Sequence, residues 1–187
     1  MKILALIGSP RKGGNTEVLV KEALTGARDL GAETELVFIP DMNIAPCDGC
    51  ESCTASGKCK IKDDMQGLYP KLTEADGIIL GTPVYYWGMT AQTKMLIDRT
   101  FVFRKERPLR NKIAGVIVVA RRRGTSETLG SFLNYFYIQK MVVVGDVIAY
   151  ADKKGEIRQN RLAMDEAREL GRVMVQIGKD NLTSRRL

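Results

Sequence analysis

The fold is decided by the stretch KILALIGSPRKGGNT, residues 2–16. It opens with a nearly continuous apolar run, Lys2–Gly8, which has the length of a buried strand. A glycine-rich turn follows and leads into Thr16–Leu30, where apolar residues recur at helical spacing. A buried strand that passes through a short turn into an amphipathic helix is the first half of a βαβ unit, so this stretch predicts a parallel sheet.

The same alternation continues along the chain. Further strands are predicted at Glu33–Ile39, Gly77–Gly81, Ile113–Ala120 and Met141–Val147, and further helices at Asp64–Glu74, Thr90–Thr100, Thr125–Gln139 and Leu162–Gly178. Five apolar strands separated by helices predict an α/β fold with a doubly wound, five-stranded parallel sheet. The expected strand order is the flavodoxin-like 2-1-3-4-5. We expect a single domain over residues 1–187, with a cysteine-rich loop at about residues 41–62.

Charge and hydropathy narrow the functional classes. The chain carries 29 basic and 22 acidic residues, a net charge of +7. The basic residues are dispersed and match no nucleic-acid-binding motif, so a solvated basic surface is expected rather than nucleic-acid binding. The apolar runs are too short to span a membrane. Met1 leads directly into a strand without a signal peptide, which predicts a cytoplasmic protein with no membrane partner.

The four cysteines of the chain lie close together, at Cys47, Cys50, Cys53 and Cys59. Gaps of two residues let thiolates converge from one loop around a metal centre, and three such ligands in a row are typical of bacterial ferredoxins. The larger gap before Cys59 departs from that pattern. The chain has no histidine, which excludes mixed Cys/His sites within one subunit. The spacing favours a [4Fe–4S] cluster, while an all-thiolate zinc site and free or redox-active thiols stay open as alternatives.

The turn after the first strand has the features of a phosphate-binding loop. Its glycines allow close backbone approach, and the following helix offers unpaired N–H groups to an anion. It matches neither the Walker pattern nor GxGxxG. The candidate ligands in this loop are Ser9, Arg11, Asn15 and Thr16.

Two more loops are expected at the same edge of the sheet, where ligands of doubly wound folds bind. Three adjacent aromatic residues follow the third strand and suit packing against a flat heteroaromatic ring. A run of arginines follows the fourth strand. The candidate ligands in these two loops are Thr82, Pro83, Val84, Tyr85, Tyr86, Trp87, Arg121 and Gly124. A phosphate at one loop and a ring at the next two describe a mononucleotide such as FMN.

These motifs together resemble the NADPH-dependent FMN reductase superfamily. The resemblance rests on Gly8-Ser9-Pro10-Arg11 through Asn15-Thr16, Cys47-Asp48-Gly49-Cys50, Gly57-Lys58-Cys59 with Lys62-Asp63-Asp64-Met65, and Gly81-Thr82-Pro83-Val84-Tyr85. Within that superfamily the compact cysteine motif resembles that of iron–sulfur flavoproteins. The resemblance implies a flavodoxin-like oxidoreductase with bound FMN, a [4Fe–4S] cluster on the four cysteines, and a homodimer or homotetramer. It also implies a ferredoxin-like electron donor. The alternative is an NAD(P)H-dependent FMN or quinone reductase without a cluster.

Two expectations concern how the centres work together. The cysteine segment follows the second strand, which neighbours the first, so the cluster and the flavin are expected at the same edge of the sheet. An acidic ferredoxin would dock on basic residues, and the candidates lie in Arg99–Lys112 and at Lys58, Lys60 and Lys62. No residue is expected to act as a nucleophile or general base.

Overall fold

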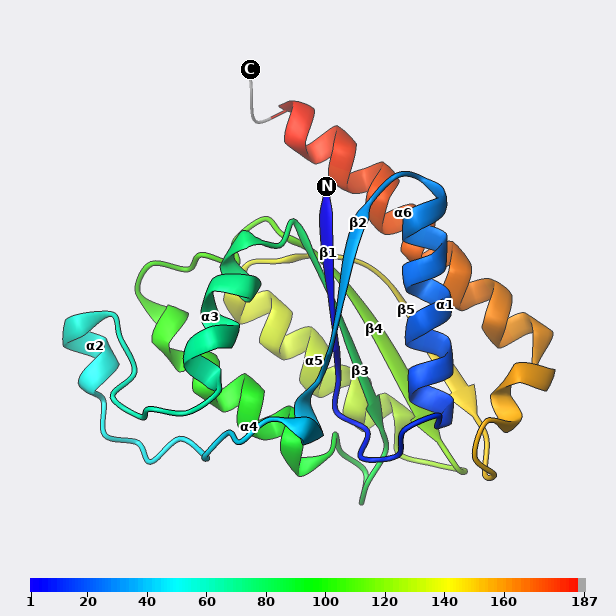
Figure 1. Ribbon diagram of the computed structural model, residues 1–187, viewed down its shortest axis with the longest axis horizontal. Coiled ribbons are helices and arrows are strands. Elements are labelled where there is room, and N and C mark those ends of the chain that lie inside the picture. Colours follow the sequence, from blue (N-terminus) through cyan, green and yellow to red (C-terminus); the bar gives the residue numbers. More distant parts are fainter. Residues whose placement is uncertain (185–187) are drawn as a thin grey trace.

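A computed structural model describes the backbone of residues 1–184 and the side chains of residues 1–180; residues 185–187, part of the predicted domain, lie outside the described residues. A five-stranded parallel sheet forms the centre of the molecule (Figure 1). Its strands are β1 (Lys2–Ile7), β2 (Glu33–Phe38), β3 (Gly77–Pro83), β4 (Ile113–Ala120) and β5 (Val142–Tyr150). The strand order is β2-β1-β3-β4-β5, which confirms the predicted topology.

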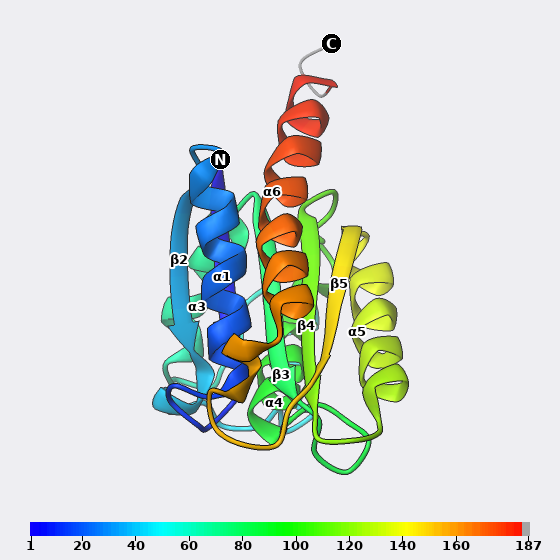
Figure 2. The ribbon, with the colours of Figure 1, turned by 90° about the vertical axis from the view of Figure 1, so that its right-hand side faces the viewer.

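Helices cover both faces of the sheet. One face carries α1 (Asn15–Asp29) and α6 (Arg161–Ser184), which stand in front of the strands in Figure 2. The other face carries α3 (Met65–Glu74), α4 (Ala91–Arg99) and α5 (Thr125–Gln139). Shorter helical pieces join these elements: η1 (Ile39–Asp41), α2 (Ser52–Ser56), η2 (Thr100–Arg104) and η3 (Glu156–Gln159).

Alternate residues of the central strand β1 pack on the two faces of the sheet. In β1, Ile3, Ala5 and Ile7 belong to the core under α1 and α6. Leu4 and Leu6 belong to the core under α3, α4 and α5. Successive side chains of a strand point to opposite faces, so a strand buried on both sides has to be apolar at every position. That requirement explains the continuous apolar run from which the sheet was predicted.

Helices α1 and α6 cross with their backbones in direct contact. A Cβ atom at Gly26 would lie 1.9 Å from the carbonyl oxygen of Arg168, and one at Gly171 would lie 1.8 Å from that of Ala23. Such distances leave no room for any side chain, so the crossing depends on both glycines. Beside it, the Arg168 guanidinium lies 2.9 Å from a carboxylate oxygen of Asp29.

The observed strands extend further than the sequence predicted at the carboxyl edge of the sheet. Strand β3 ends at Pro83 rather than Gly81, because Thr82 and Pro83 pair with β4. Strand β5 ends at Tyr150 rather than Val147 and pairs with β4 on both sides of a register shift between Ala114 and Gly115. Helix α2 was not predicted, since SCTAS has no apolar periodicity. The other boundaries agree with the prediction to within one residue, apart from the end of α6, which runs past Gly178 to Ser184.

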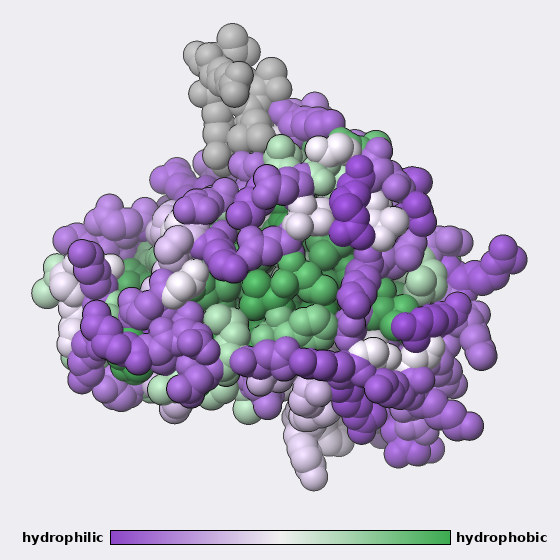
Figure 3. Space-filling model, viewed as in Figure 1, coloured by the Kyte–Doolittle hydropathy of each residue, from purple (hydrophilic) through white to green (hydrophobic). Residues whose placement is uncertain are grey.

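The face of the molecule seen in Figure 3 is largely hydrophilic. In the view of Figure 3, apolar atoms gather near the middle, where Figure 1 places β1 and β2, and polar atoms surround them. No helix among residues 1–184 is both long and apolar enough to cross a bilayer.

Candidate functional site

The turn between β1 and α1 leaves the start of the helix open. Gly14 precedes the first helical residue, and no side chain caps that end. The first N–H groups of α1 are therefore available to an anion. Glu17 shapes the turn from inside, because its carboxylate accepts the Gly13 N–H and lies 2.6 Å from the Lys21 ammonium. Burial alone raises the pKa of Glu17, but these two partners hold it below the usual value, so the carboxylate stays charged.

Asn15 joins this turn to the loop after β5. Its Nδ2 donates to the carbonyl oxygen of Lys153 at 2.9 Å, and its Oδ1 accepts from the Ile157 N–H at 3.2 Å. The sequence assigned Asn15 to a bound phosphate. In the structure the side chain lines the cavity and also holds two of its loops together, with both its oxygen and its nitrogen engaged.

A cavity of about 220 Å³ lies between these loops at the carboxyl edge of the sheet. The predicted ligands that line it are Ser9, Arg11, Asn15, Thr16, Pro83, Val84, Tyr85 and Arg121. The sequence did not single out the other lining residues, Gly14, Val119, Ala120, Ala151, Asp152 and Lys154. The last three follow β5. They were missed because that strand was predicted to end at Val147 rather than Tyr150. Arg121 and Asp152 form an ion pair of 3.0 Å between the β4 and β5 loops.

The aromatic residues after β3 form a tight hairpin turn. Tyr85 and Gly88 exchange two backbone hydrogen bonds, of 2.9 and 3.1 Å. Tyr86 and Trp87 at its tip have φ angles of +47° and +60°. This is the left-handed region, which costs bulky residues about 1–3 kcal/mol and is found mainly at functional sites. The Tyr86 side chain is 97% exposed. A strained turn that presents aromatic rings to solvent indicates a binding surface.

Two predicted ligands support this hairpin from below without lining the cavity. Thr82 is fully buried, and its hydroxyl accepts hydrogen bonds from the Thr90 N–H at 3.1 Å and the Thr93 hydroxyl at 3.3 Å. Gly124 has a φ of +89°, and a Cβ atom there would lie 2.9 Å from the Cα of Trp87. These residues fix the two ends of the binding surface, and neither offers a free side chain to a ligand.

A wider, open cavity continues from the first. It has a volume of about 860 Å³, and its lining consists of Val84, Tyr85, Tyr86, Trp87, Arg121, Arg122 and Arg123. Val84, Tyr85 and Arg121 line both cavities. The smaller cavity thus offers helix N–H groups and hydroxyls, while the larger offers aromatic rings and cations. Together they suit a ligand with a phosphate at one end and a flat ring at the other.

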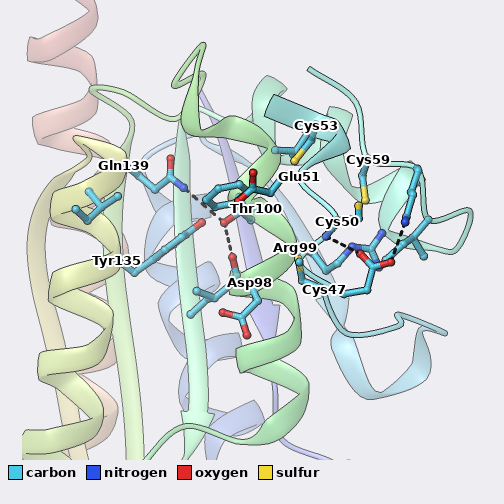
Figure 4. A pocket seen from close by; sticks show the side chains of 18 residues that line it. Cys47, Cys50, Glu51, Cys53, Cys59, Asp98, Arg99, Thr100, Tyr135 and Gln139 are labelled. Carbon is cyan, nitrogen blue, oxygen red and sulfur yellow. Dashed lines mark hydrogen bonds and ion pairs between the residues drawn. The ribbon is translucent and has the colours of Figure 1, made fainter. Parts of the chain in front are cut away.

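All four cysteines line a separate cavity of about 480 Å³. In Figure 4 they come from the loop on one side, Tyr135 and Gln139 come from α5 on the other, and Asp98 and Thr100 lie between. Cys47 and Cys50 are exposed, whereas Cys53 and Cys59 are half-buried. Burial raises the pKa of the Cys53 thiol, and the charges of the other three cysteines raise it further. The other three cysteines therefore lie close enough to Cys53 to affect its ionisation.

The cysteine loop offers the donor atoms that a metal cluster needs, but its thiols do not lie close enough together to hold one. Four thiols around one cavity are the donor set of a [4Fe–4S] cluster. Among the described residues, however, no three His, Cys, Asp or Glu side chains converge closely enough to hold a metal ion. Within the loop, the Ser52 hydroxyl contacts the Cys50 sulfur at 3.4 Å, and the Cys50 N–H donates to Asp48 at 3.2 Å. Binding a cluster requires this loop to draw its thiols together.

The two sites lie further apart on the fold than the sequence suggested. The cysteine segment does leave the sheet at its carboxyl edge, after β2 and η1. It then runs outward to α2, far from the turn below β1 in Figure 1. Its cavity is lined by the last residues of α4 and α5 and shares no residue with the two cavities at the sheet edge.

The basic segment Arg99–Lys112 also differs from expectation, because its first and last residues already bind groups within the protein. Arg99 is fully buried, and its guanidinium pairs with Asp63. Lys112 donates to the carbonyl oxygen of Thr73 at 2.8 Å and also to that of Ala75. Neither is available to a partner protein. The exposed basic residues of this segment are Arg104, Lys105, Arg107 and Arg110.

Comparison with known proteins agrees with this arrangement. The family model for NADPH-dependent FMN reductase matches residues 1–156. An iron-sulfur flavoprotein of Methanocaldococcus jannaschii is 40% identical over 189 residues, covering 96% of this chain and 98% of that protein. An iron-sulfur flavoprotein of Methanosarcina thermophila is 41% identical over 149 residues, or 78% of each chain.

Solved structures support the fold. A flavone reductase superposes with a TM-score of 0.77 at 22% identity, covering 96% of this chain and 64% of that one. A flavodoxin from the domain Archaea superposes with a TM-score of 0.67 at 15% identity, covering 96% and 99%. At such identities the likeness concerns the α/β architecture alone.

Proposed function

The chain belongs to the iron–sulfur flavoproteins of the NADPH-dependent FMN reductase family, and from this membership we propose that it moves electrons between FMN and a [4Fe–4S] cluster on Cys47, Cys50, Cys53 and Cys59. The family makes it a flavin-dependent oxidoreductase. When bound, FMN supplies one- or two-electron steps and a cluster supplies one-electron steps. The observation that carries the proposal is that all four cysteines line one cavity.

We assign the FMN site to the two joined cavities. The N–H groups at the start of α1 and the Ser9 and Thr16 hydroxyls would bind the phosphate. The hairpin of Tyr85, Tyr86 and Trp87 would hold the ring and shield it from water. Asn15 would act indirectly, by keeping the loop after β5 closed against the phosphate turn.

Trp87 gives this assignment a direct test, because it is the sole tryptophan of the chain. Titrating FMN into the flavin-free protein should quench most of its fluorescence, since a flavin stacked nearby takes up the excitation energy. Riboflavin, which lacks the phosphate, should need a concentration at least about tenfold higher, as expected when charge-assisted hydrogen bonds are missing. Unchanged tryptophan emission at saturating FMN would place the ring elsewhere.

The electron donor is proposed to be an acidic ferredoxin-like protein. Arg104, Lys105, Arg107 and Arg110 are exposed. They follow or belong to η2, which packs beside α2 of the cysteine loop. A partner bound to these residues would therefore stand close to the cluster. The predicted homodimer or homotetramer is retained as part of the proposal.

Reduction by a ferredoxin should slow steeply as salt is added. Exposed charges attract over only about 10 Å at 0.1 M ionic strength, and steering mainly affects the association rate. In stopped-flow experiments, Arg104→Glu and Lys105→Glu should each reduce that rate without changing iron or FMN content. Arg161→Glu makes the same change in net charge at the start of α6 and serves as the control. A rate independent of salt would contradict the ferredoxin proposal.

One observation favours the alternative, an NAD(P)H-dependent FMN or quinone reductase without a cluster. The open cavity carries three arginines beside three aromatic rings, a combination suited to a flat, anionic dinucleotide. Fast reduction of the flavin by NADPH alone, in protein without iron, would support this alternative.

A further inference from the structure

Arg99 lies beneath the cysteine loop as a buried charge with one donor unused. Its side chain is 0% exposed and that of Asp63 is 6% exposed. The guanidinium binds Asp63 through both terminal nitrogens, Nη1 to Oδ2 and Nη2 to Oδ1, the latter at 3.0 Å. Its remaining N–H, on Nε, is the one buried side-chain polar atom among the described residues without a hydrogen-bond partner.

The same pair closes the cysteine loop at its two ends. Arg99 Nη1 donates to the carbonyl oxygen of Ala45 at 2.7 Å, and Asp63 accepts from the Ala45 N–H at 2.8 Å. Ala45 precedes the first cysteine, and Asp63 follows the last. The far end is fixed again by Gln66, whose Nε2 donates to the carbonyl oxygen of Cys59 at 3.2 Å. The two ends of the loop that carries the four thiols are thus held together through Arg99 of α4.

An unpaired donor on a buried cation costs free energy and therefore needs an explanation, which a bound cofactor can supply. Arg99 lines the cavity that the four cysteines line. Its pKa stands above the usual value despite burial, through Asp63, Tyr69 and Cys59. A cluster bound by four thiolates is anionic, its sulfurs accept hydrogen bonds, and such hydrogen bonds stabilise the reduced form.

On the basis of the proposed cluster, we propose that Arg99 is a second anchor for that group. Its Nη atoms hold the ends of the cysteine loop, and its Nε–H donates to a cluster sulfur, which raises the reduction potential. Arg99 is a positioning residue for the loop and a hydrogen-bond donor to the cofactor. No covalent step is assigned to it.

Arg99→Lys tests this role, because lysine keeps the charge but loses the planar fork and Nε. In anaerobically reconstituted protein with FMN bound, a strong iron chelator should remove iron at least about tenfold faster than from the unchanged protein. The cluster's midpoint should fall enough to shift the oxidised-to-reduced ratio about tenfold, or 59 mV for a one-electron couple. Arg168→Lys is the matched control, since Arg168 also binds a carboxylate but on the opposite face of the sheet.

Asp63→Asn provides a second test should Arg99→Lys fail to fold. It leaves the guanidinium and its Nε in place and removes one negative charge, so the midpoint should move upward, opposite to Arg99→Lys. Wild-type protein that takes up no iron would overturn the proposed function and this inference together. Wild-type protein that holds a cluster, with equal midpoints and chelation rates in Arg99→Lys, would overturn the role of Arg99 alone. A downward shift in Asp63→Asn would do the same.

Discussion

Replacing Cys50 with alanine is expected to abolish cluster binding while FMN stays bound. In the proposed function Cys50 supplies one of four sulfur ligands, and its segment shares no residue with the cavities assigned to the flavin. Iron and acid-labile sulfide should therefore fall to background after anaerobic purification and reconstitution, with FMN content close to that of the unchanged protein. Alanine is preferred to serine, because an alkoxide can substitute for a thiolate ligand.

Ser52→Ala is the matched control in the same loop. The Ser52 hydroxyl contacts the Cys50 sulfur at 3.4 Å, so its removal alters the surroundings of the thiol without removing a ligand. Iron content should be retained. Equal iron in the unchanged protein and in Cys50→Ala would remove the cluster from the proposed function and leave a flavin reductase with free thiols.

The sheet could be predicted from the sequence because its central strands, β1, β3 and β4, are buried on both faces. The requirement for apolar residues at every position of β1 and β4 is visible without coordinates, and the alternation with helices then fixes a parallel topology. The end of β3 was missed for the same reason. Thr82 and Pro83 do not read as an apolar run, and only their pairing with β4 makes them strand.

At the site, the sequence identified the loops better than the roles of individual side chains. Ser9, Asn15 and Tyr85 line the cavity as expected, but Asn15 also binds the loop after β5, and Thr82 is buried against α4. These contacts join residues far apart in the chain, so local motifs carry no sign of them. Arg99 is the clearest case. Within a run of basic residues it looked like surface charge, and only its partner Asp63 reveals a buried anchor.

Gly171→Ala is expected to destabilise the protein strongly, although alanine is the better helix former. The added Cβ would lie 1.8 Å from the carbonyl oxygen of Ala23 and 2.8 Å from the nitrogen of Ala27, both backbone atoms of α1. Neither can yield unless α1 moves away from α6. Overpacking of this kind costs about 1–3 kcal/mol or more. Unfolding in urea should show the loss directly, as a lower midpoint at an unchanged slope.

Gly130→Ala separates that clash from the change in helix propensity. Gly130 lies within α5, and a Cβ atom there meets no atom within 4 Å. This variant should gain about 0.5–1 kcal/mol, so the two alanine substitutions should differ by roughly 1.5–4 kcal/mol. The displacement should also reach the ligand, because α1 begins in the turn assigned to the phosphate, and FMN should therefore lose more affinity than riboflavin. If Gly171→Ala proved as stable as Gly130→Ala, the crossing of α1 and α6 would not depend on glycine at position 171.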